Sequence, residues 1–410
     1  MAETILLAGG GIGGLTAALS LQAAGFAPVV FEAVREFRPL GVGINLLPHA
    51  VRELTELGLA ERLPAIGVAT RELRYVSAHG QEIWREDRGR AAGYNWPQYS
   101  VHRGELQMML LDVCRERGIP VHPGRRVIGF AQDGASVTAR FAEGGEATGA
   151  ALIGADGIHS AIRAHFAPGE GAPSWQGAIL WRATSIAAPY LTGATMVQAG
   201  HHNQKFVCYP IAHLPDGRVL TNWIAEMKVD PAQGFDREDW NREADRNRFL
   251  PHYESWNWGW LDVPGLIRAA ERVLEYPMVD RDPLERWTDG RVTLLGDAAH
   301  PMYPIGSNGA SQAILDARQL ALHLARHGVP EGLLAYEEAR RPPTAKLTLA
   351  NRALGPDLIL EEVHRRAPGG FSDLHAVISR QELEEVSANY KKLAGFDPRL
   401  LNERESWSVS

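Results

Sequence analysis

A glycine-rich turn near the N-terminus is the first segment whose residue types and spacing could do chemistry. Gly9-Gly10-Gly11-Ile12-Gly13-Gly14 fits the pattern G-x-G-x-x-G. It follows a short apolar run, residues 4–8, and precedes residues 15–24, where apolar side chains recur at helical spacing. In such a strand-turn-helix unit the glycines permit the turn, close approach to a pyrophosphate and close helix packing, while the helix N-terminus offers N–H groups to phosphates. The motif predicts a dinucleotide site.

Two acidic positions sharpen this prediction. The next apolar run, residues 28–31, ends at Glu32, about 20 residues beyond the turn, where a carboxylate can accept a hydrogen bond from a ribose hydroxyl. A second motif, Gly296-Asp297-Ala298-Ala299-His300-Pro301, follows the apolar run 292–295. Together the two motifs favour FAD, extended across the domain. The alternatives are a plain glycine-rich turn in another α/β protein and an Asp297 that only caps a helix.

The composition is that of a large globular enzyme. The chain has 410 residues, of which 45% are hydrophobic and 22% charged, and its net charge of -7 gives no reason to expect a nucleic-acid partner. Its two cysteines, Cys114 and Cys208, form no C-x-x-C motif, which favours a cytoplasmic location. We expect no membrane span, because no apolar run reaches about 18 residues. His201-His202 lacks companions at metal-ligand spacing, so we expect no metal.

The pattern of apolar residues predicts the elements that must position these motifs. Helices are expected at 54–63 and from Arg103 onward, with a capping box at 379–382. The predicted strands lie at 72–84, 179–184, 205–211 and 219–224, and the segment 151–157 is expected to return to the parallel sheet. A hairpin is predicted at 127–141, with its turn at Asp133-Gly134. A helix-rich insertion is expected at 236–249, followed by alternating tryptophans at 256, 258 and 260.

These elements predict an α/β fold with a discontinuous nucleotide domain. The Rossmann-like FAD-binding domain would comprise residues 1–75, 97–170 and 285–350. A mainly β substrate-binding sheet domain, residues 76–96 and 171–284, would be inserted into it, and residues 351–410 would form a C-terminal helical segment. The chain is expected to be a monomer or a homodimer.

The order of the motifs resembles that of group A flavoprotein monooxygenases, the family of para-hydroxybenzoate hydroxylase. The resemblance spans about residues 1 to 350 and includes a third motif, Gly154-Ala155-Asp156-Gly157-Ile158-His159-Ser160, between the other two. The strings 38–45, 97–111, 276–284 and 296–316 are most similar to the phenazine-modifying branch, which includes 5-methylphenazine-1-carboxylate 1-monooxygenases. Residues 355–410 show no comparable match.

The resemblance implies an activity and its co-substrates. Such an enzyme would use NAD(P)H and O₂ to hydroxylate a planar aromatic or heteroaromatic substrate through a flavin C4a-hydroperoxide, with or without loss of a carboxylate. Because the chain has one glycine-rich fingerprint, NAD(P)H would bind transiently rather than in a second Rossmann domain. A flavin-dependent oxidase or dehydrogenase on the same scaffold and a non-catalytic FAD-binding protein are the alternatives.

The resemblance also implies roles for cofactor residues. Asp297 would bind a ribityl hydroxyl, Arg103 the ribityl or pyrophosphate region, and Arg35 would flank the adenosine. The backbone near Val127 would touch the adenine, and Asp156 would order loops near the pyrophosphate; a plain turn is the alternative for Asp156. The segment that passes under the flavin would contribute Gly306, Asn308, Gly309 and Ala310.

The substrate is expected between the inserted sheet and the segment that precedes Gly306. The candidate walls are Trp181, Tyr209, Trp223, Met302, Tyr303 and Pro304. An aromatic residue on a strand is at least as often part of a core, so this alternative applies to each of them. Arg182 could meet a substrate carboxylate or form a surface ion pair. The sequence indicates no acid/base dyad and no catalytic side chain.

Overall fold

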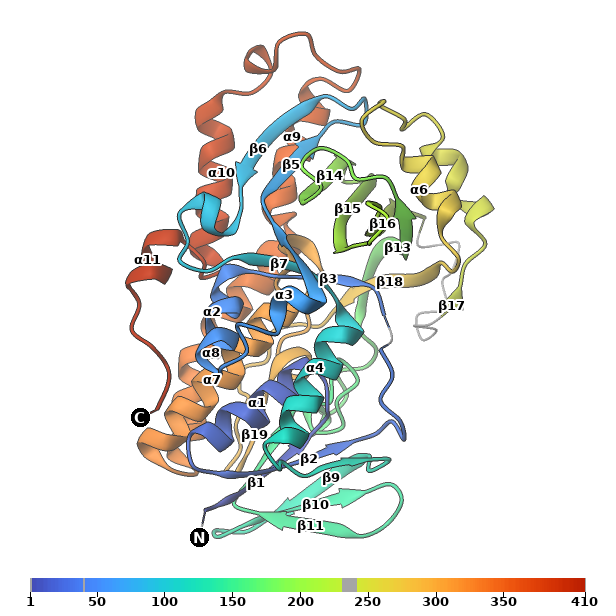
Figure 1. Cartoon of the computed structure of the whole chain (residues 1–410). Helices are drawn as coiled ribbons and strands as arrows, with labels where there is room; N and C mark the ends of the chain where they lie inside the picture. The colour runs from blue at the N-terminus through green and yellow to red at the C-terminus, as the bar shows by residue number, and fades with distance from the viewer. Residues whose placement is uncertain (1, 40, 231–241, 410) are drawn as a thin grey trace.

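A five-stranded parallel sheet joins segments from both ends of the first 300 residues (Figure 1). The computed structural model describes residues 2–39, 41–230 and 242–409. The strand order is β19-β12-β1-β2-β8. The bounds are β1 Thr4–Ala8, β2 Ala27–Glu32, β8 Val121–Pro123, β12 Ala151–Gly154 and β19 Val292–Leu294. Residues 5–8 of the central strand β1 are buried, as expected for a parallel sheet that is covered on both faces.

Long helices pack around this sheet and against each other. They are α1 Ile12–Ala23, α4 Arg103–Glu116, α7 Gly309–His327 and α8 Glu331–Arg352. The helix predicted at 54–63 was placed wrongly, because α2 spans Pro48–Glu56 and a separate short helix, α3, spans Leu63–Ile66. Pro48 suits the first turn of α2, and Gly58, with a φ of 81°, turns the chain away after it.

Two further sheets have three strands each. Strands β3 Gly43–Leu46, β7 Gln98–His102 and β4 Gly67–Thr70 pair in the order β3-β7-β4. Strands β9 Val127–Gln132, β10 Val137–Phe141 and β11 Glu146–Gly149 form an antiparallel sheet whose first two strands are the predicted hairpin. A short helix, α5 Arg163–Phe166, follows β12.

An eight-stranded sheet forms the second large layer, in the order β17-β18-β13-β16-β15-β14-β5-β6. Its strands are β5 Glu72–Val76, β6 Glu82–Asp87, β13 Ser174–Ala187, β14 Thr195–His201, β15 Gln204–His213, β16 Val219–Lys228, β17 Arg242–Glu243 and β18 Leu274–Asp280. All neighbours are antiparallel except β14 and β5. Because successive side chains alternate, each strand contributes to both faces of the sheet.

The two faces of the eight-stranded sheet pack against different parts of the chain. Helix α6 (Val263–Ala269) and the aromatic segment around Trp256 cover one face. Helices α9 (Leu358–Arg366) and α10 (Arg380–Leu393) pack on the other face beside β5 and β6, and α11 (Pro398–Glu403) follows them (Figure 1). Ser379 and Glu382 form the predicted capping box at the start of α10.

The insertion that was predicted to be rich in helix, residues 236–249, has no α-helix in its described part. Residues 236–241 lie outside the described residues. The described remainder, 242–249, contains strand β17 and a 3₁₀ turn at Arg246–Arg248, so the helix prediction was wrong there. The α/β class, with a parallel sheet, a large mixed sheet and C-terminal helices, is confirmed. The residue boundaries of the predicted domains stay a prediction.

Candidate active site

The glycine-rich turn joins β1 to α1 through three different steric requirements. Gly9 has a φ of 112°, and a Cβ there would lie 2.3 Å from the carbonyl oxygen of Ala155. A Cβ on Gly14 would lie 2.0 Å from the carbonyl oxygen of Gly9, whereas one on Gly11 would meet nothing within 4 Å. Helix α1 begins at Ile12 without a side-chain cap. No side chain therefore caps its first N–H groups, which leaves them available to an anion.

Predicted adenosine-side residues gather at the end of β2. The Glu32 carboxylate accepts hydrogen bonds from the backbone N–H of Gly10, at 2.6 Å, and of Val34, at 2.9 Å. It therefore also shapes the glycine-rich turn. Arg35 is exposed beside Gly124, and Val127 is buried at the start of β9. Glu32, Arg35 and Val127 thus lie in one region, as contacts with a single adenosine would require. The contacts themselves stay a prediction.

Asp156 organises the loop that follows β12. Its carboxylate accepts hydrogen bonds from Ser160 Oγ at 2.5 Å and from the Ala161 N–H at 2.8 Å. Burial raises the pKa of Asp156, although these hydrogen bonds oppose the increase. The backbone at Ala155 and Asp156 packs against Gly9. Asp156 thus holds the loop of residues 156–161, which lies beside the glycine-rich turn, through hydrogen bonds inside that loop.

The Gly-Asp motif is held by a buried acid that sequence reasoning missed. Asp316 on α7 accepts hydrogen bonds from the Gly296 N–H at 3.1 Å and from Arg340 Nε at 2.6 Å, and it contacts His300 Nε2 at 2.5 Å. Although burial opposes it, His300 and Arg340 lower the pKa of Asp316 to about 2. An acidic residue in a helix is usually exposed to solvent, so nothing in the sequence around Asp316 indicated that this residue is buried.

Arg163 is a second support that sequence reasoning missed. Its buried guanidinium donates hydrogen bonds to the carbonyl oxygens of Ala298, at 3.1 Å, and Ala299, at 2.9 Å, and pairs with Glu170. It therefore joins the segment after the third motif to the Gly-Asp motif.

Asp297 itself is available to a ligand. Its carboxylate lies at the edge of a cavity, and no hydrogen bond joins it to another residue that the structure describes. The surrounding protein raises the pKa of Asp297, while His300 and Arg103 act in the opposite direction. Arg103, exposed at the start of α4, likewise has no ion-pair partner among the described residues. An unpaired carboxylate and guanidinium suit the hydroxyls and phosphates of a cofactor.

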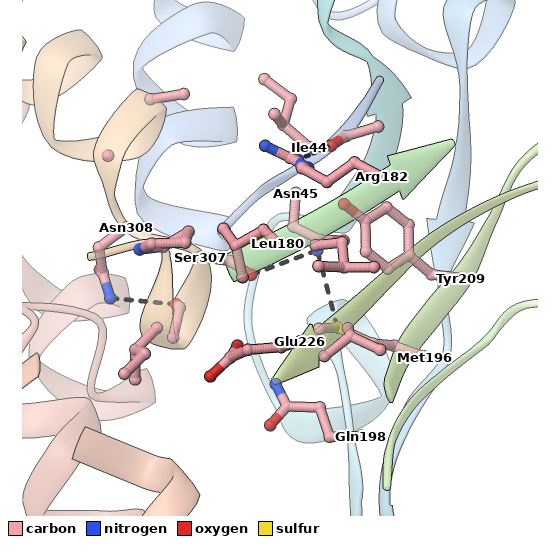
Figure 2. A pocket seen from close by; sticks show the side chains of 18 of the residues that line it. Ile44, Asn45, Leu180, Arg182, Met196, Gln198, Tyr209, Glu226, Ser307 and Asn308 are labelled. Atoms are coloured by element: carbon pink, nitrogen blue, oxygen red, sulfur yellow. Dashed lines mark hydrogen bonds between the residues drawn. The ribbon is translucent and has the colours of Figure 1, made fainter. Parts of the chain in front are cut away.

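The cavity has a volume of about 220 Å³ and lies between the eight-stranded sheet and the segment that leads into α7 (Figure 2). Successive rows across the sheet face it: Leu180, Glu226 and Lys205; then Arg182, Ile224, Val207 and Gln198; then Tyr209 and Met196. The opposite wall is built from Gly43, Ile44, Asn45, Asp297, Met302, Pro304, Ile305, Gly306, Ser307, Asn308, Gly309, Ala310 and Asp357. The predicted flavin-side residues Gly306, Asn308, Gly309 and Ala310 are thus together.

A tyrosine from the C-terminal segment supports this opposite wall. Gly306 has a φ of 69°, and a Cβ there would lie 1.9 Å from the Tyr390 hydroxyl oxygen. That hydroxyl accepts a hydrogen bond from Asn308 Nδ2 at 2.7 Å and lies 2.9 Å from Asn351 Oδ1. The buried Asn308 Oδ1 has no partner among the described residues. It is an unused acceptor beside the uncapped start of α7, where N–H donors are also available.

Two of the predicted substrate walls were placed wrongly. Trp181 and Trp223 face away from the cavity, because their neighbours Arg182 and Ile224 face into it and strand side chains alternate. Trp181 stacks on Phe249, with 4.6 Å between the ring centroids, in the core beyond the sheet.

Tyr303 was also assigned wrongly. It packs in a small buried cluster with Leu180 and Met278 rather than in the cavity wall. Tyr209, Met302 and Pro304 do line the cavity; their contact with substrate stays a prediction.

Charged side chains in the cavity were largely missed by sequence reasoning. Arg182 donates a hydrogen bond to the Gly43 carbonyl oxygen at 3.1 Å, and its buried Nε has no partner among the described residues. Burial lowers the pKa of Arg182, and the nearby Tyr209 opposes the decrease. Burial raises the pKa of Tyr209 to about 12, against the influence of Arg182. No acidic side chain forms a salt bridge with Arg182 in the described part of the chain, which contradicts a surface ion pair.

Lys205, Glu226 and Asp357 form a buried ionic group on the same cavity. The Lys205 ammonium lies 2.9 Å from Glu226 Oε2 and 2.6 Å from Asp357 Oδ2. Alternation could have placed both residues on the cavity face, because Lys205 shares its side of β15 with Val207 and Glu226 shares its side of β16 with Ile224. Asp357 belongs to the segment after residue 350, for which the sequence indicated no role.

The arrangement fits FAD. The uncapped helix and open space at Gly11 suit a pyrophosphate, Asp297 and Arg103 have unused polar groups, and Asn308 offers an unused acceptor. Among the described residues, no group of three or more His, Cys, Asp or Glu could hold a metal ion, and no helix is long and apolar enough to cross a membrane.

Comparisons with known proteins agree with this geometry. The model of the FAD binding domain family matches residues 2–351. A phenazine 1,6-dicarboxylic acid hydroxylase of Lysobacter antibioticus is 47% identical over 85% of this chain and 89% of its own length. A 3-amino-4-hydroxybenzoate 2-monooxygenase of Streptomyces platensis is 32% identical over 87% of this chain and 89% of its own length. The structure of Klebsiella pneumoniae HpxO with FAD and uric acid has a TM-score of 0.72, at 25% identity, and covers 98% of this chain and 95% of that one.

The chain therefore belongs to the FAD binding domain family, as a group A flavoprotein monooxygenase. It is an FAD-dependent aromatic hydroxylase that acts on an aromatic or heteroaromatic substrate, and the family implies NAD(P)H as the reductant.

Proposed function

We propose that the substrate is a phenazine carboxylic acid or a planar heteroaromatic acid of similar size. The observation that carries this proposal is Arg182, a guanidinium in the cavity wall without an acidic partner. A buried cation without a counterion is costly, and a ligand carboxylate would compensate it with strong, charge-assisted hydrogen bonds. The similarity to a phenazine 1,6-dicarboxylic acid hydroxylase supports the phenazine ring and the phenazine-modifying branch.

Bound FAD would activate O₂. The residues of the chain would position the substrate and exclude water from the reacting atoms. NAD(P)H gives two electrons, one oxygen atom of O₂ enters the ring, and the other leaves as water. Arg182 would orient the carboxylate, and Tyr209 would restrict the ring from the sheet side. Orientation of this kind lowers the barrier without an acid/base residue. Asp297, Arg103, Glu32 and the glycine-rich turn would hold the cofactor, and the free, buried thiols of Cys114 and Cys208 support a cytoplasmic protein.

The test uses phenazine-1-carboxylic acid and uncharged phenazine. With the acid, wild-type holoenzyme should consume NAD(P)H and incorporate one atom of ¹⁸O₂ into the product. Arg182→Gln should weaken binding of the acid by about tenfold or more, because a charge-assisted hydrogen bond is lost, and should barely change binding of phenazine. Arg218→Gln is the control, since Arg218 is exposed and pairs with Asp216. Equal losses for both ligands would contradict a role for Arg182 in carboxylate binding.

An anaerobic experiment separates the alternative of an oxidase or dehydrogenase. The acid alone should leave the flavin oxidised, whereas the acid with NAD(P)H should allow its reduction. Reduction of the flavin by the acid alone would reject the monooxygenase proposal for this substrate.

A further inference from the structure

An ionic group, formed by Lys205, Glu226 and Asp357, is both buried and part of the cavity wall. All three side chains are at least nine-tenths buried, and all three line the cavity. Two carboxylates share one ammonium. Burial raises the pKa of Glu226, and Lys205 opposes the increase. A buried group of this kind is expensive unless its remaining polar atoms find partners.

One atom of this group and one atom of a neighbouring side chain have no hydrogen-bond partner among the described residues. Asp357, 6% exposed, has no hydrogen-bond partner at Oδ1 among the described residues, and Gln198, 5% exposed, has none at Oε1. Glu226 is held through Oε2, and its carboxylate projects into the space facing Ser307 and Asn308 (Figure 2). Both carboxylates engage Lys205, and the two buried atoms without a partner here, Asp357 Oδ1 and Gln198 Oε1, are hydrogen-bond acceptors.

The register of the sheet separates this acceptor group from Arg182. Glu226 pairs with Leu180 across β13 and β16, and Arg182 pairs with Ile224 one row further along. Diagonal positions of this kind are roughly 7–8 Å apart. One row of the cavity wall therefore presents the Glu226 carboxylate, and the next presents the Arg182 guanidinium on β13 and the Gln198 side chain on β14.

We propose that Glu226, positioned by Lys205 and Asp357, is a specificity-determining residue that accepts a hydrogen bond from an O–H or N–H on the ring system of the substrate, at the end remote from its carboxylate. This inference rests on the proposed function and deepens it. The preferred substrate class is a planar aromatic acid with a distal donor. Asp357 gives residues 351–410 a part in the substrate site, and Lys205 acts as a positioning residue.

Glu226→Gln inverts the polarity of this contact. Lys205 retains the amide oxygen as its partner, so the amide NH₂ turns toward the cavity and becomes a donor. The ligands are phenazine-1-carboxylic acid, its distal-ring hydroxy derivative and the methyl ether of that derivative. Binding to oxidised, FAD-loaded enzyme is measured by calorimetry, without NAD(P)H. Glu82→Gln, on β6 of the same sheet and outside the cavity lining, is the control.

Wild type and Glu82→Gln should bind the hydroxy acid more tightly than the ether. Glu226→Gln should reverse this order, with about a tenfold loss for the hydroxy acid and at most a twofold change for the unsubstituted acid. Asp357→Asn reports on the same acceptor group from another element if Glu226→Gln does not fold. A purely structural role would change all three ligands equally, and that result would overturn the inference while leaving the proposed function intact. Failure of wild type to bind any of the three would overturn the proposed function and, with it, this inference.

Discussion

The two faces of the eight-stranded sheet use the same strands for different purposes. On the face toward α6, Trp181, Trp223 and Phe206 pack against further aromatic residues, and the buried Trp181 Nε1 donates to Glu275 at 2.7 Å. Buried polar atoms without partners among the described residues occur on both faces, for example Glu275 Oε1 on the packing face. Only those on the cavity face, such as Arg182 Nε and Gln198 Oε1, belong to residues that line space a ligand can enter. Unmet hydrogen-bonding capacity is costly in a folded protein and persists where a ligand satisfies it. The comparison indicates that one face supplies stability and the other recognition.

The largest expected effect tests the packing face. Trp223 is fully buried and donates a hydrogen bond from Nε1 to Ser185 Oγ at 2.9 Å. Trp223→Ala should lower the free energy of unfolding by about 3–5 kcal/mol, because it removes a large buried side chain and leaves a cavity. Urea unfolding of holoenzyme measures this change. A loss below about 1 kcal/mol would show that this face does not carry the stability assigned to it.

Asp297, in the cavity wall opposite the sheet, and Arg103, at the start of α4, should affect cofactor binding rather than stability. Neither side chain pairs with another described residue, so Asp297→Ala and Arg103→Ala should leave the unfolding of apoprotein nearly unchanged. Each should weaken FAD binding by roughly 1.5–3 kcal/mol, about 10- to 150-fold, through loss of a charge-assisted hydrogen bond. Equilibrium dialysis measures FAD retention. Unchanged retention in both variants would contradict their assignment to the cofactor.

A buried histidine on α2, His49, predicts how the stability of the protein responds to acid. Burial, with contributions from Arg340 and Arg404, lowers the pKa of His49 to about 3. Since the unfolded value is about 6.5, stability from this neutral histidine is present above pH 6.5 and is lost as the pH falls toward 3. Between pH 7.5 and pH 5 the loss should be about 2 kcal/mol.

A matched variant isolates this contribution. His49→Gln cannot titrate, so its free energy of unfolding should decline less with acid than that of wild type over the same interval. Urea unfolding at several pH values gives the difference. Parallel pH profiles for the two proteins would exclude His49 as the source.

The sequence best predicts those regions whose structure depends on contacts between residues that are close together in the chain. The glycine-rich turn depends on neighbours in the chain, so G-x-G-x-x-G predicted its strand, turn and helix. Alternation likewise separates Trp181 from Arg182, but it cannot say which of the two faces the cavity, because aromatic residues occur on both faces. The group of Lys205, Glu226 and Asp357 is harder still to predict. Its third member comes from a segment beyond residue 350, and only the packing of that segment on the sheet brings it near.

The smallest expected effect concerns Tyr209 on the cavity face, which both supports Arg182 and lines the cavity. The Tyr209 hydroxyl is a hydrogen-bonding neighbour of Arg182 and Asn222, while its ring lines the cavity. Tyr209→Phe keeps the ring and removes only the hydroxyl, so stability should change by no more than about 1 kcal/mol, the net value of one hydrogen bond. Because Arg182 is then held less firmly, the substrate should be positioned less well, and more H₂O₂ should be released per NAD(P)H consumed. Product and peroxide are quantified together at saturating phenazine-1-carboxylic acid, with Trp181→Phe on the opposite face as the control. An equal rise in peroxide from both variants would mean that a general loosening of the sheet, rather than the contact between Tyr209 and Arg182, controls coupling.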